Sequence, residues 1–267
     1  MEQNDEIEKT INKLGSLESL GKVTVVKTHI PMKRETDVKR EAQVETRERS
    51  NIKIMTMKIE TKMEINIGTW IRNIICLMDG SVIAITQFGT VNFFTVASKI
   101  QKHFLIPGEA YSVTQINQYT IALTYPGEKA IKIFNMENTK VTKVIKLDKV
   151  CRGLSFANNS LAVGLDRDEI RIIDLEGNTL KSIQVESVSY LFHLVYCNDR
   201  VTYSDSNGKA VCSVDESGKQ IWQYKQDLTG PRGLCTDTYG NIIVADGESK
   251  RIIVISKDGQ GSQVLIN

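Results

Sequence analysis

The stretch Pro231–Ser256, PRGLCTDTYGNIIVADGESKRIIVIS, decides the fold of this chain. It contains two short apolar runs, Ile242–Ala245 and Ile252–Ile255, rich in the Val and Ile residues that favour strands. A turn at Tyr239–Asn241 precedes the first run, and a polar loop at Asp246–Lys250 separates the two. The stretch therefore predicts a small antiparallel sheet.

Related stretches recur upstream about every 40 residues, a spacing typical of the four-stranded blades of a β-propeller. An apolar residue opens the second strand of each unit, at Ile83, Ile121, Leu161, Val201 and Ile242. Three residues later comes a small residue, at Thr86, Thr124, Gly164, Ser204 and Ala245. Small side chains would leave room where adjacent blades converge on a central channel. The sequence thus predicts five stacked blades between Trp70 and Asn267, because a single blade cannot bury its apolar faces alone.

The composition of the chain limits its class. With 267 residues, of which 41% are hydrophobic, we expect one propeller plus an appendage. The formal net charge is only +2, so the strongly basic surface of many nucleic-acid-binding proteins is not expected. The N-terminal MEQNDEIEK is polar and acidic, unlike a signal peptide, and no apolar run approaches the roughly 20 residues of a membrane span. These features predict a cytoplasmic protein.

The cysteines give no sign of a metal site or a disulfide framework. There are five, an odd number without a CxxC pair, at Cys76, Cys151, Cys197, Cys212 and Cys235. All lie in or beside apolar strands, so we expect reduced, buried thiols.

The N-terminal quarter of the chain has a different pattern. Residues 1–21 predict a helix whose apolar stripe spans about two heptads, too few to choose between the end of a coiled coil and an ordinary docking helix. Residues 22–68 predict a charged linker with strands, one of them at 22–30 and a solvated, mixed-charge stretch at 33–50. Alternating apolar residues predict strands within 51–67, which could join the last blade or occupy part of a sixth blade position. The propeller itself is expected to span 69–267.

Several motifs resemble the NHL repeat. The last unit carries Pro231-x-Gly233-Leu234, Asp237, Gly240-Asn241-Ile242, Val244-Ala245-Asp246 and Arg251-Ile252. The third unit echoes it with Arg152-Gly153-Leu154, and the fourth with Tyr203-Ser204-Asp205. With the helix and linker in front, the chain resembles the C-terminal part of a divergent, invertebrate-like tripartite-motif (TRIM) protein. Such propellers usually close six blades, whereas this sequence holds five and lacks the last.

The resemblance implies a non-catalytic protein-interaction module. In that family the propeller selects the partner or substrate, and a separate RING domain, absent here with the B-box, acts as the E3 ubiquitin ligase. A full-length relative would dimerise through its coiled coil. The alternative that the resemblance leaves open is an RNA-binding NHL propeller acting in post-transcriptional regulation, which should show a broad positive face.

The remaining polar residues predict no catalytic residue, metal or cofactor. His29, His103 and His193 lack a nearby nucleophile or carboxylate pattern. Asp166, Asp168 and Glu169 are expected in one solvated loop. Asp205 and Asp246 end equivalent strands and are expected to accept hydrogen bonds in blade turns. A propeller hydrolase would instead show clustered carboxylates at one channel mouth.

One set of residues suggests a binding site. Arg72, Arg152 and Arg232 all stand at the start of the innermost strand, in the first, third and fifth blades. Ser112 and Phe192 hold this position in the second and fourth. The arginines could pair with carboxylates between blades, or they could form a ring of guanidinium groups that binds an acidic or phosphorylated ligand. The five residues are therefore the predicted ligand-binding set at the channel mouth.

Overall fold

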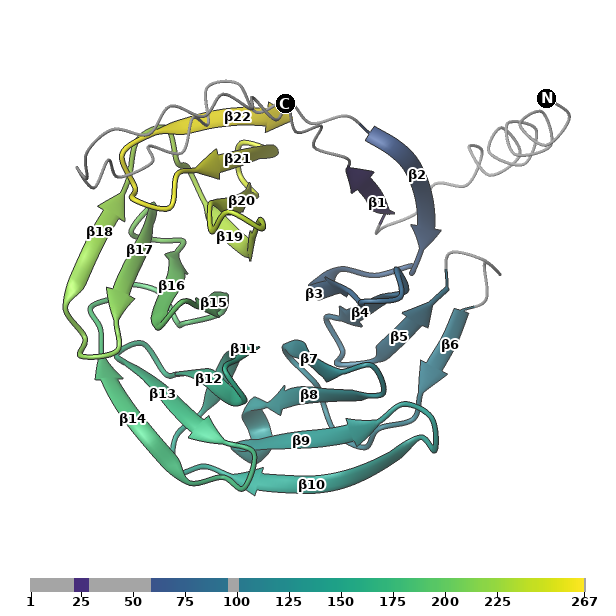
Figure 1. The fold of residues 1–267 in the computed structure, drawn as a ribbon. Helices are drawn as coiled ribbons and strands as arrows, with labels where there is room; N and C mark the ends of the chain where they lie inside the picture. The colour runs from purple at the N-terminus through teal and green to yellow at the C-terminus, as the bar shows by residue number, and fades with distance from the viewer. Residues whose placement is uncertain (1–21, 29–58, 96–100, 267) are drawn as a thin grey trace, which may run out of the picture.

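The computed structural model describes residues 22–28, 59–95 and 101–266. Five four-stranded antiparallel blades surround a central channel, which confirms the predicted all-β, five-bladed propeller (Figure 1). The helix in these ranges is a single 3-10 turn, η2 (Pro126–Glu128). None of the helices in the described part of the chain is long and apolar enough to cross a membrane. The helix predicted for residues 1–21 lies outside the described residues.

Each blade is built from four consecutive strands, with the first beside the channel and the fourth on the outer rim (Figure 1). Blade 1 contains β3 (Ile71–Cys76), β4 (Val82–Thr86), β5 (Val91–Phe94) and β6 (Gln101–Phe104). Blade 2 contains β7 (Val113–Asn117), β8 (Thr120–Tyr125), β9 (Ala130–Asn135) and β10 (Lys140–Lys146). Blade 3 contains β11 (Cys151–Ala157), β12 (Ser160–Leu165), β13 (Glu169–Asp174) and β14 (Thr179–Gln184). Blade 4 contains β15 (Leu194–Cys197), β16 (Arg200–Asp205), β17 (Ala210–Asp215) and β18 (Gln220–Tyr224). Blade 5 contains β19 (Pro231–Thr236), β20 (Ile242–Asp246), β21 (Arg251–Ile255) and β22 (Ser262–Ile266).

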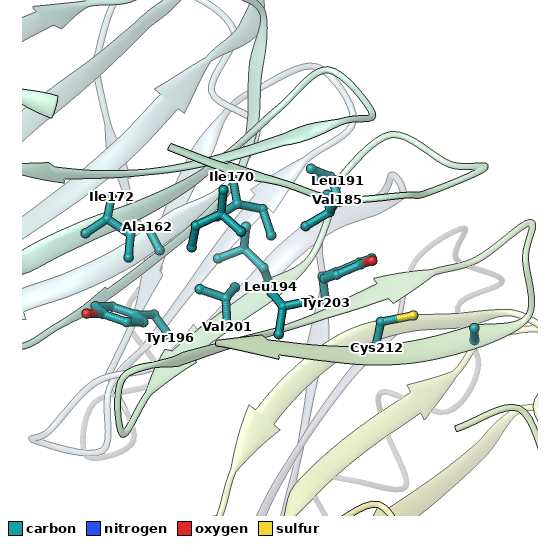
Figure 2. Close-up of a cluster of buried hydrophobic side chains, with 13 residues drawn as sticks. Ala162, Ile170, Ile172, Val185, Leu191, Leu194, Tyr196, Val201, Tyr203 and Cys212 are labelled. Atoms are coloured by element: carbon teal, nitrogen blue, oxygen red, sulfur yellow. The ribbon is translucent and has the colours of Figure 1, made fainter. Parts of the chain in front are cut away.

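The core lies between the faces of adjacent blades. Figure 2 shows one such layer, in which Ala162 and Ile170 of blade 3 face Val201 and Tyr203 of blade 4. Strands β4 and β12 are buried along their whole length, because side chains on both of their faces meet a neighbouring blade. This packing explains why β4 and β12 are mostly apolar at successive positions and do not alternate between apolar and polar residues.

The column of small residues has the predicted role at Gly164. A Cβ atom on this glycine would lie 2.6 Å from the carbonyl oxygen of Leu191, in the segment that leads into blade 4. It would also lie 2.7 Å from the Leu191 Cβ. Blades 3 and 4 therefore approach so closely here that even a methyl group would force them apart.

Two buried aspartates fasten the chain where it enters blades 4 and 5. Asp246, at the end of β20, accepts hydrogen bonds from the backbone N–H of Thr229 at 3.1 Å and Gly230 at 2.6 Å. Asp205, at the end of β16, likewise accepts from the backbone N–H groups of Val188 and Ser189, both at 3.0 Å. These contacts confirm that the two aspartates act as hydrogen-bond acceptors in blade turns.

The N-terminal strands form a sheet of their own. β1 (Lys22–Thr28) pairs antiparallel with β2 (Ile59–Asn66), so strands occur in both segments, 22–30 and 51–67, where alternation predicts them. This two-stranded sheet lies in the gap of the ring between blades 5 and 1 (Figure 1). The four strands of blade 5 all come from the C-terminal stretch, so β2 pairs outside the last blade.

Two expectations need correction. Glu169 does not belong to a solvated loop: it begins β13, is only 3% exposed, and pairs with Lys149 at 2.9 Å and Arg171 at 2.8 Å. The sequence does not reveal this burial, because the cationic partners that stabilise the buried acid, Arg171 of β13 and Lys149 just before β11, contact it only in the folded blade. The five thiols are free, but only Cys151 and Cys212 are buried, whereas Cys76 and Cys235 are exposed and Cys197 is intermediate.

Candidate functional site

The three predicted arginines reach the same end of the channel. Each is the second residue of an innermost strand, Arg72 in β3, Arg152 in β11 and Arg232 in β19. The guanidinium carbons of Arg72 and Arg152 lie 5.3 and 5.6 Å from the centroid of the Tyr111 ring. Arg232 is exposed, and its positive charge also acts to lower the pKa of Tyr111. The predicted arginine set is therefore gathered around a single tyrosine that the sequence did not single out.

Aromatic rings hold these guanidinium groups. Arg152 lies 4.3 Å from the Tyr190 ring centroid and 5.3 Å from that of Phe192. Arg167, from the loop after β12, lies 4.5 Å from the same Tyr190 ring. Phe192 stacks on Tyr111 at 5.6 Å with an interplanar angle of 22°. We call Arg72, Arg152, Arg167, Tyr111, Tyr190 and Phe192 the arginine–aromatic cluster.

The cluster differs from an ion-pair network. Within residues 59–95 and 101–266, no carboxylate forms an ion pair with Arg72, Arg152 or Arg232, whereas Arg171 and Arg251 do have acidic partners. The Nε of Arg152 is buried without a hydrogen-bond acceptor in the described structure. Ion pairing between blades therefore does not explain the arginine pattern among these residues. Contact between a guanidinium and an aromatic face stabilises the arrangement and leaves the positive charge uncompensated.

A chain of hydrogen bonds fixes the strand starts relative to one another. The Asn73 side-chain amide donates to the Ser112 hydroxyl at 3.2 Å. The Ser112 backbone N–H donates to the Thr124 hydroxyl at 3.1 Å, and that hydroxyl donates to the Arg152 carbonyl at 2.6 Å. Blades 1, 2 and 3 are thereby connected at the level of the arginines. Ser112, a predicted binding residue, is only 2% exposed, so it positions its neighbours as well as lining the channel.

The channel encloses a cavity of about 780 Å³. Arg72, Arg232, Ser112 and Phe192 line it, but Arg152 does not, because it is turned into the aromatic rings. Four of the five predicted residues therefore face the cavity. Trp70, which precedes β3 and is 70% exposed, lines it as well.

Two titratable residues of the cavity wall are kept neutral. Burial, helped by the charge of Arg232, lowers the pKa of His193 to about 4. Burial raises the pKa of Tyr111, although the charges of three arginines act in the opposite direction. At neutral pH both side chains are uncharged, so the charge of the cavity wall comes from its arginines.

The described residues offer little for catalysis. No group of three or more His, Cys, Asp or Glu side chains in the described ranges is placed to hold a metal ion. Cys235 is accessible from the cavity, but the protein around it desolvates its thiol and, with the charge of Asp237, raises the pKa of that thiol. A thiol with a raised pKa is mostly protonated at neutral pH and is a weak nucleophile.

Comparison with known proteins gives the fold. No protein-family model and no curated protein matches the sequence. Among solved structures, the nidogen/laminin complex superposes with a TM-score of 0.65 at 14% identity, over 79% of this chain and 86% of that one. Streptogramin B lyase superposes with a TM-score of 0.59 at 14% identity, over 73% of this chain and 68% of that one. Virginiamycin B lyase from Staphylococcus aureus gives 0.58 at 14% identity, over 73% and 69%. These neighbours are propellers of the NHL/YVTN type, and at this identity the similarity concerns the fold alone.

Proposed function

We propose that this chain is a non-catalytic recognition module whose channel mouth binds an acidic or phosphorylated segment of a protein partner. One observation carries the proposal: arginines from alternate blades gather at one mouth, and no described carboxylate neutralises Arg72, Arg152 or Arg232. Guanidinium groups so close repel one another, and a bound anion relieves that repulsion. Propellers often serve as protein-interaction scaffolds, and the described fold is compatible with that use.

The aromatic rings make the arginines suitable for this role. A long arginine side chain loses rotamer freedom when it binds a ligand, which reduces the affinity that its hydrogen bonds can supply. Tyr111 and Tyr190 already fix Arg72, Arg152 and Arg167 in the unbound protein. The planar guanidinium can then make charge-assisted, often bidentate hydrogen bonds to a carboxylate or phosphate at a lower entropic cost.

The NHL-like motifs extend the proposal to the whole protein. Asp205 and Asp246, which belong to those motifs, hold the entries of blades 4 and 5 through the hydrogen bonds described above. In this proposal the chain is the substrate-selecting part of a cytoplasmic TRIM-like E3 ubiquitin ligase, and the chain alone transfers no ubiquitin. A reconstituted ubiquitination assay with the isolated chain should give no product above background.

RNA is the competing ligand, and one feature favours it. Trp70 is 70% exposed beside the arginines, where a nucleotide base could stack on it. The rings of Tyr111 and Tyr190, however, already contact guanidinium groups or another ring, so they offer less free surface to bases. A small net charge of +2 also provides less of the electrostatic attraction that RNA binding usually needs. These points favour a protein partner.

The test is recovery of partners from a lysate by wild-type protein and by the Arg152→Ala/Arg232→Ala double variant. We expect the variant to recover much less partner, since each lost charged hydrogen bond costs about 1.5–3 kcal/mol. Lys146→Ala, which removes an exposed charge from the outer strand β10, is the matched control. Circular dichroism should show the same fold for all three proteins. Equal recovery by the wild type and the double variant would refute the proposal, and loss of recovery after ribonuclease treatment would favour RNA instead.

A further inference from the structure

We infer that the central cavity, which shares Arg72 and Arg232 with the mouth site of the proposed function, also binds a small hydroxyl-bearing organic phosphate. The cavity of about 780 Å³ falls within the size range of small-molecule sites, roughly 300–1,000 Å³. It lies in the channel inside the ring and is lined by residues of several blades, among them Ile71, Leu154 and Leu234. A ligand here would contact the innermost strands of the ring, unlike one that rests on the outer face.

The charge of the lining selects an anion. Arg72 and Arg232, from blades 1 and 5, are the charged residues among the described side chains that line it, and these include no Asp, Glu or Lys. His193 adds no charge at neutral pH, because its pKa is lowered to about 4. Two guanidinium groups without an acid in the same wall favour a phosphate, which offers three acceptor oxygens and up to two negative charges.

The polar, uncharged part of the lining selects hydroxyl groups on the ligand. Hydroxyl side chains such as Ser112, Thr114 and Ser155 share the wall with the amides of Asn73 and Gln87. Hydroxyl groups both donate and accept hydrogen bonds, so they match the alcohols of a polyol better than an apolar tail. Trp70 also lines the wall and offers a flat face against which the C–H groups of a sugar ring can pack. The combined chemistry is that of a sugar phosphate.

Gly233 allows the cavity to be filled without disturbing the arginines. It lies in β19 and lines the cavity, and a Cβ atom there would meet only the Ala245 Cβ at 3.8 Å, an ordinary contact distance. A leucine at this position should therefore be tolerated by the local backbone while it occupies ligand space. Gly233→Leu thus fills space in the cavity while it keeps both guanidinium groups in the sequence.

The experiment titrates the purified full chain with glucose phosphate, and separately with glucose and with inorganic phosphate, by calorimetry. Trp70 fluorescence gives a second readout, since the other tryptophan, Trp222, is only 7% exposed and lies in the outer strand β18. We expect glucose phosphate to bind at least about tenfold more tightly than glucose or inorganic phosphate, because only glucose phosphate can use both the arginines and the hydroxyl side chains of the lining. Arg72→Gln and Arg232→Gln should each weaken binding about tenfold or more, the effect of losing one charged hydrogen bond.

The control variants define the outcomes. Lys146→Ala should bind glucose phosphate like the wild type, and Gly233→Leu should lose this binding while keeping the melting temperature. Retained binding in Gly233→Leu, equal affinity for inorganic phosphate, or no binding at millimolar ligand would each overturn the inference. A wild type that binds glucose phosphate but recovers no partner would sustain it while refuting the proposed function.

Discussion

The guanidinium carbon of Arg152 lies 4.3 Å from the centroid of the Tyr190 ring, and the two residues come from blade 3 and from the segment leading into blade 4. This contact does two things at once. It joins neighbouring blades at the channel, and it holds a cation in place without neutralising it. Because the ring also contacts Arg167, one tyrosine orients two positive charges. Tyr190 is therefore the residue whose replacement best tests the cluster.

Replacing Tyr190 with Leu should weaken partner recovery and lower the free energy of unfolding by about 1–2 kcal/mol. Each exposed cation–π contact is worth about 0.5–1 kcal/mol, and two are lost. Tyr190→Phe keeps the ring and should behave like the wild type in both measurements. Tyr239→Leu, in the exposed turn before β20, is the control for removing a surface tyrosine. Denaturant unfolding and the lysate assay supply the readouts, and an unimpaired Tyr190→Leu protein would contradict the role of the ring.

Gly164→Ala should destabilise the propeller by about 1–3 kcal/mol, the usual cost of overpacking. The added methyl group would meet the Leu191 carbonyl at 2.6 Å, where backbone rather than a flexible side chain must move. Gly127→Ala is the matched control, because nothing lies within 4 Å of a Cβ placed there. Thermal unfolding of the two variants should separate them clearly. Equal melting temperatures for Gly164→Ala and Gly127→Ala would mean that blades 3 and 4 can move apart at this point without loss of stability.

Asp246→Asn should cost about 1.5–3 kcal/mol of stability at neutral pH, since charge-assisted bonds to buried donors are lost. Burial alone would raise the pKa of Asp246, but hydrogen bonds from Ser249, Gly230 and Thr229 outweigh it and the pKa is lowered. The stabilisation is therefore present above the ordinary aspartate pKa of about 3.9 and is lost as pH falls through the lower folded value. Unfolding measured across acidic pH should show a shallower decline below about pH 4 for the variant. Asp199→Asn, at an exposed turn, is the control for replacing an aspartate with asparagine.

His193 should make the protein less stable as pH falls from about 6.5 to about 4. Its folded pKa is lowered to about 4 by burial and by Arg232, whereas an unfolded histidine titrates near 6.5. Between these values the unfolded chain binds a proton that the folded protein does not, so acid favours unfolding. His193→Gln should remove this part of the pH dependence, and His103→Gln, at an exposed position in β6, is the control for replacing a histidine. Superimposable curves for wild type and His193→Gln would show that the imidazole is not desolvated in solution.

The sequence predicted the blades better than the site because the two depend on different information. The strand pattern repeats along the sequence, so Ile83 and Ile242 could be aligned from their spacing alone. In the structure Ile242 is the first residue of β20 and Ile83 is the second residue of β4. The arginines repeat in the same register and were found in the same way. Tyr111 and Tyr190 do not occupy an equivalent column, and their contacts with arginines depend on side-chain directions across blades, which no local pattern encodes. The burial of Glu169 was missed because its partners Arg171 and Lys149, though in or beside the same blade, are brought to it only by the folded sheet.

The separate pairing of β1 with β2 has a consequence for how such rings change over evolutionary time. In the described structure every complete blade is one uninterrupted piece of chain, and no hydrogen-bonded ladder runs from the first blade to the last. A contiguous segment encoding one blade can therefore be duplicated, lost or exchanged without splitting a sheet between distant parts of the chain. Such a ring can change its number of blades one at a time, and the two-stranded sheet of β1 and β2 lies between the first and last blades without pairing with either (Figure 1).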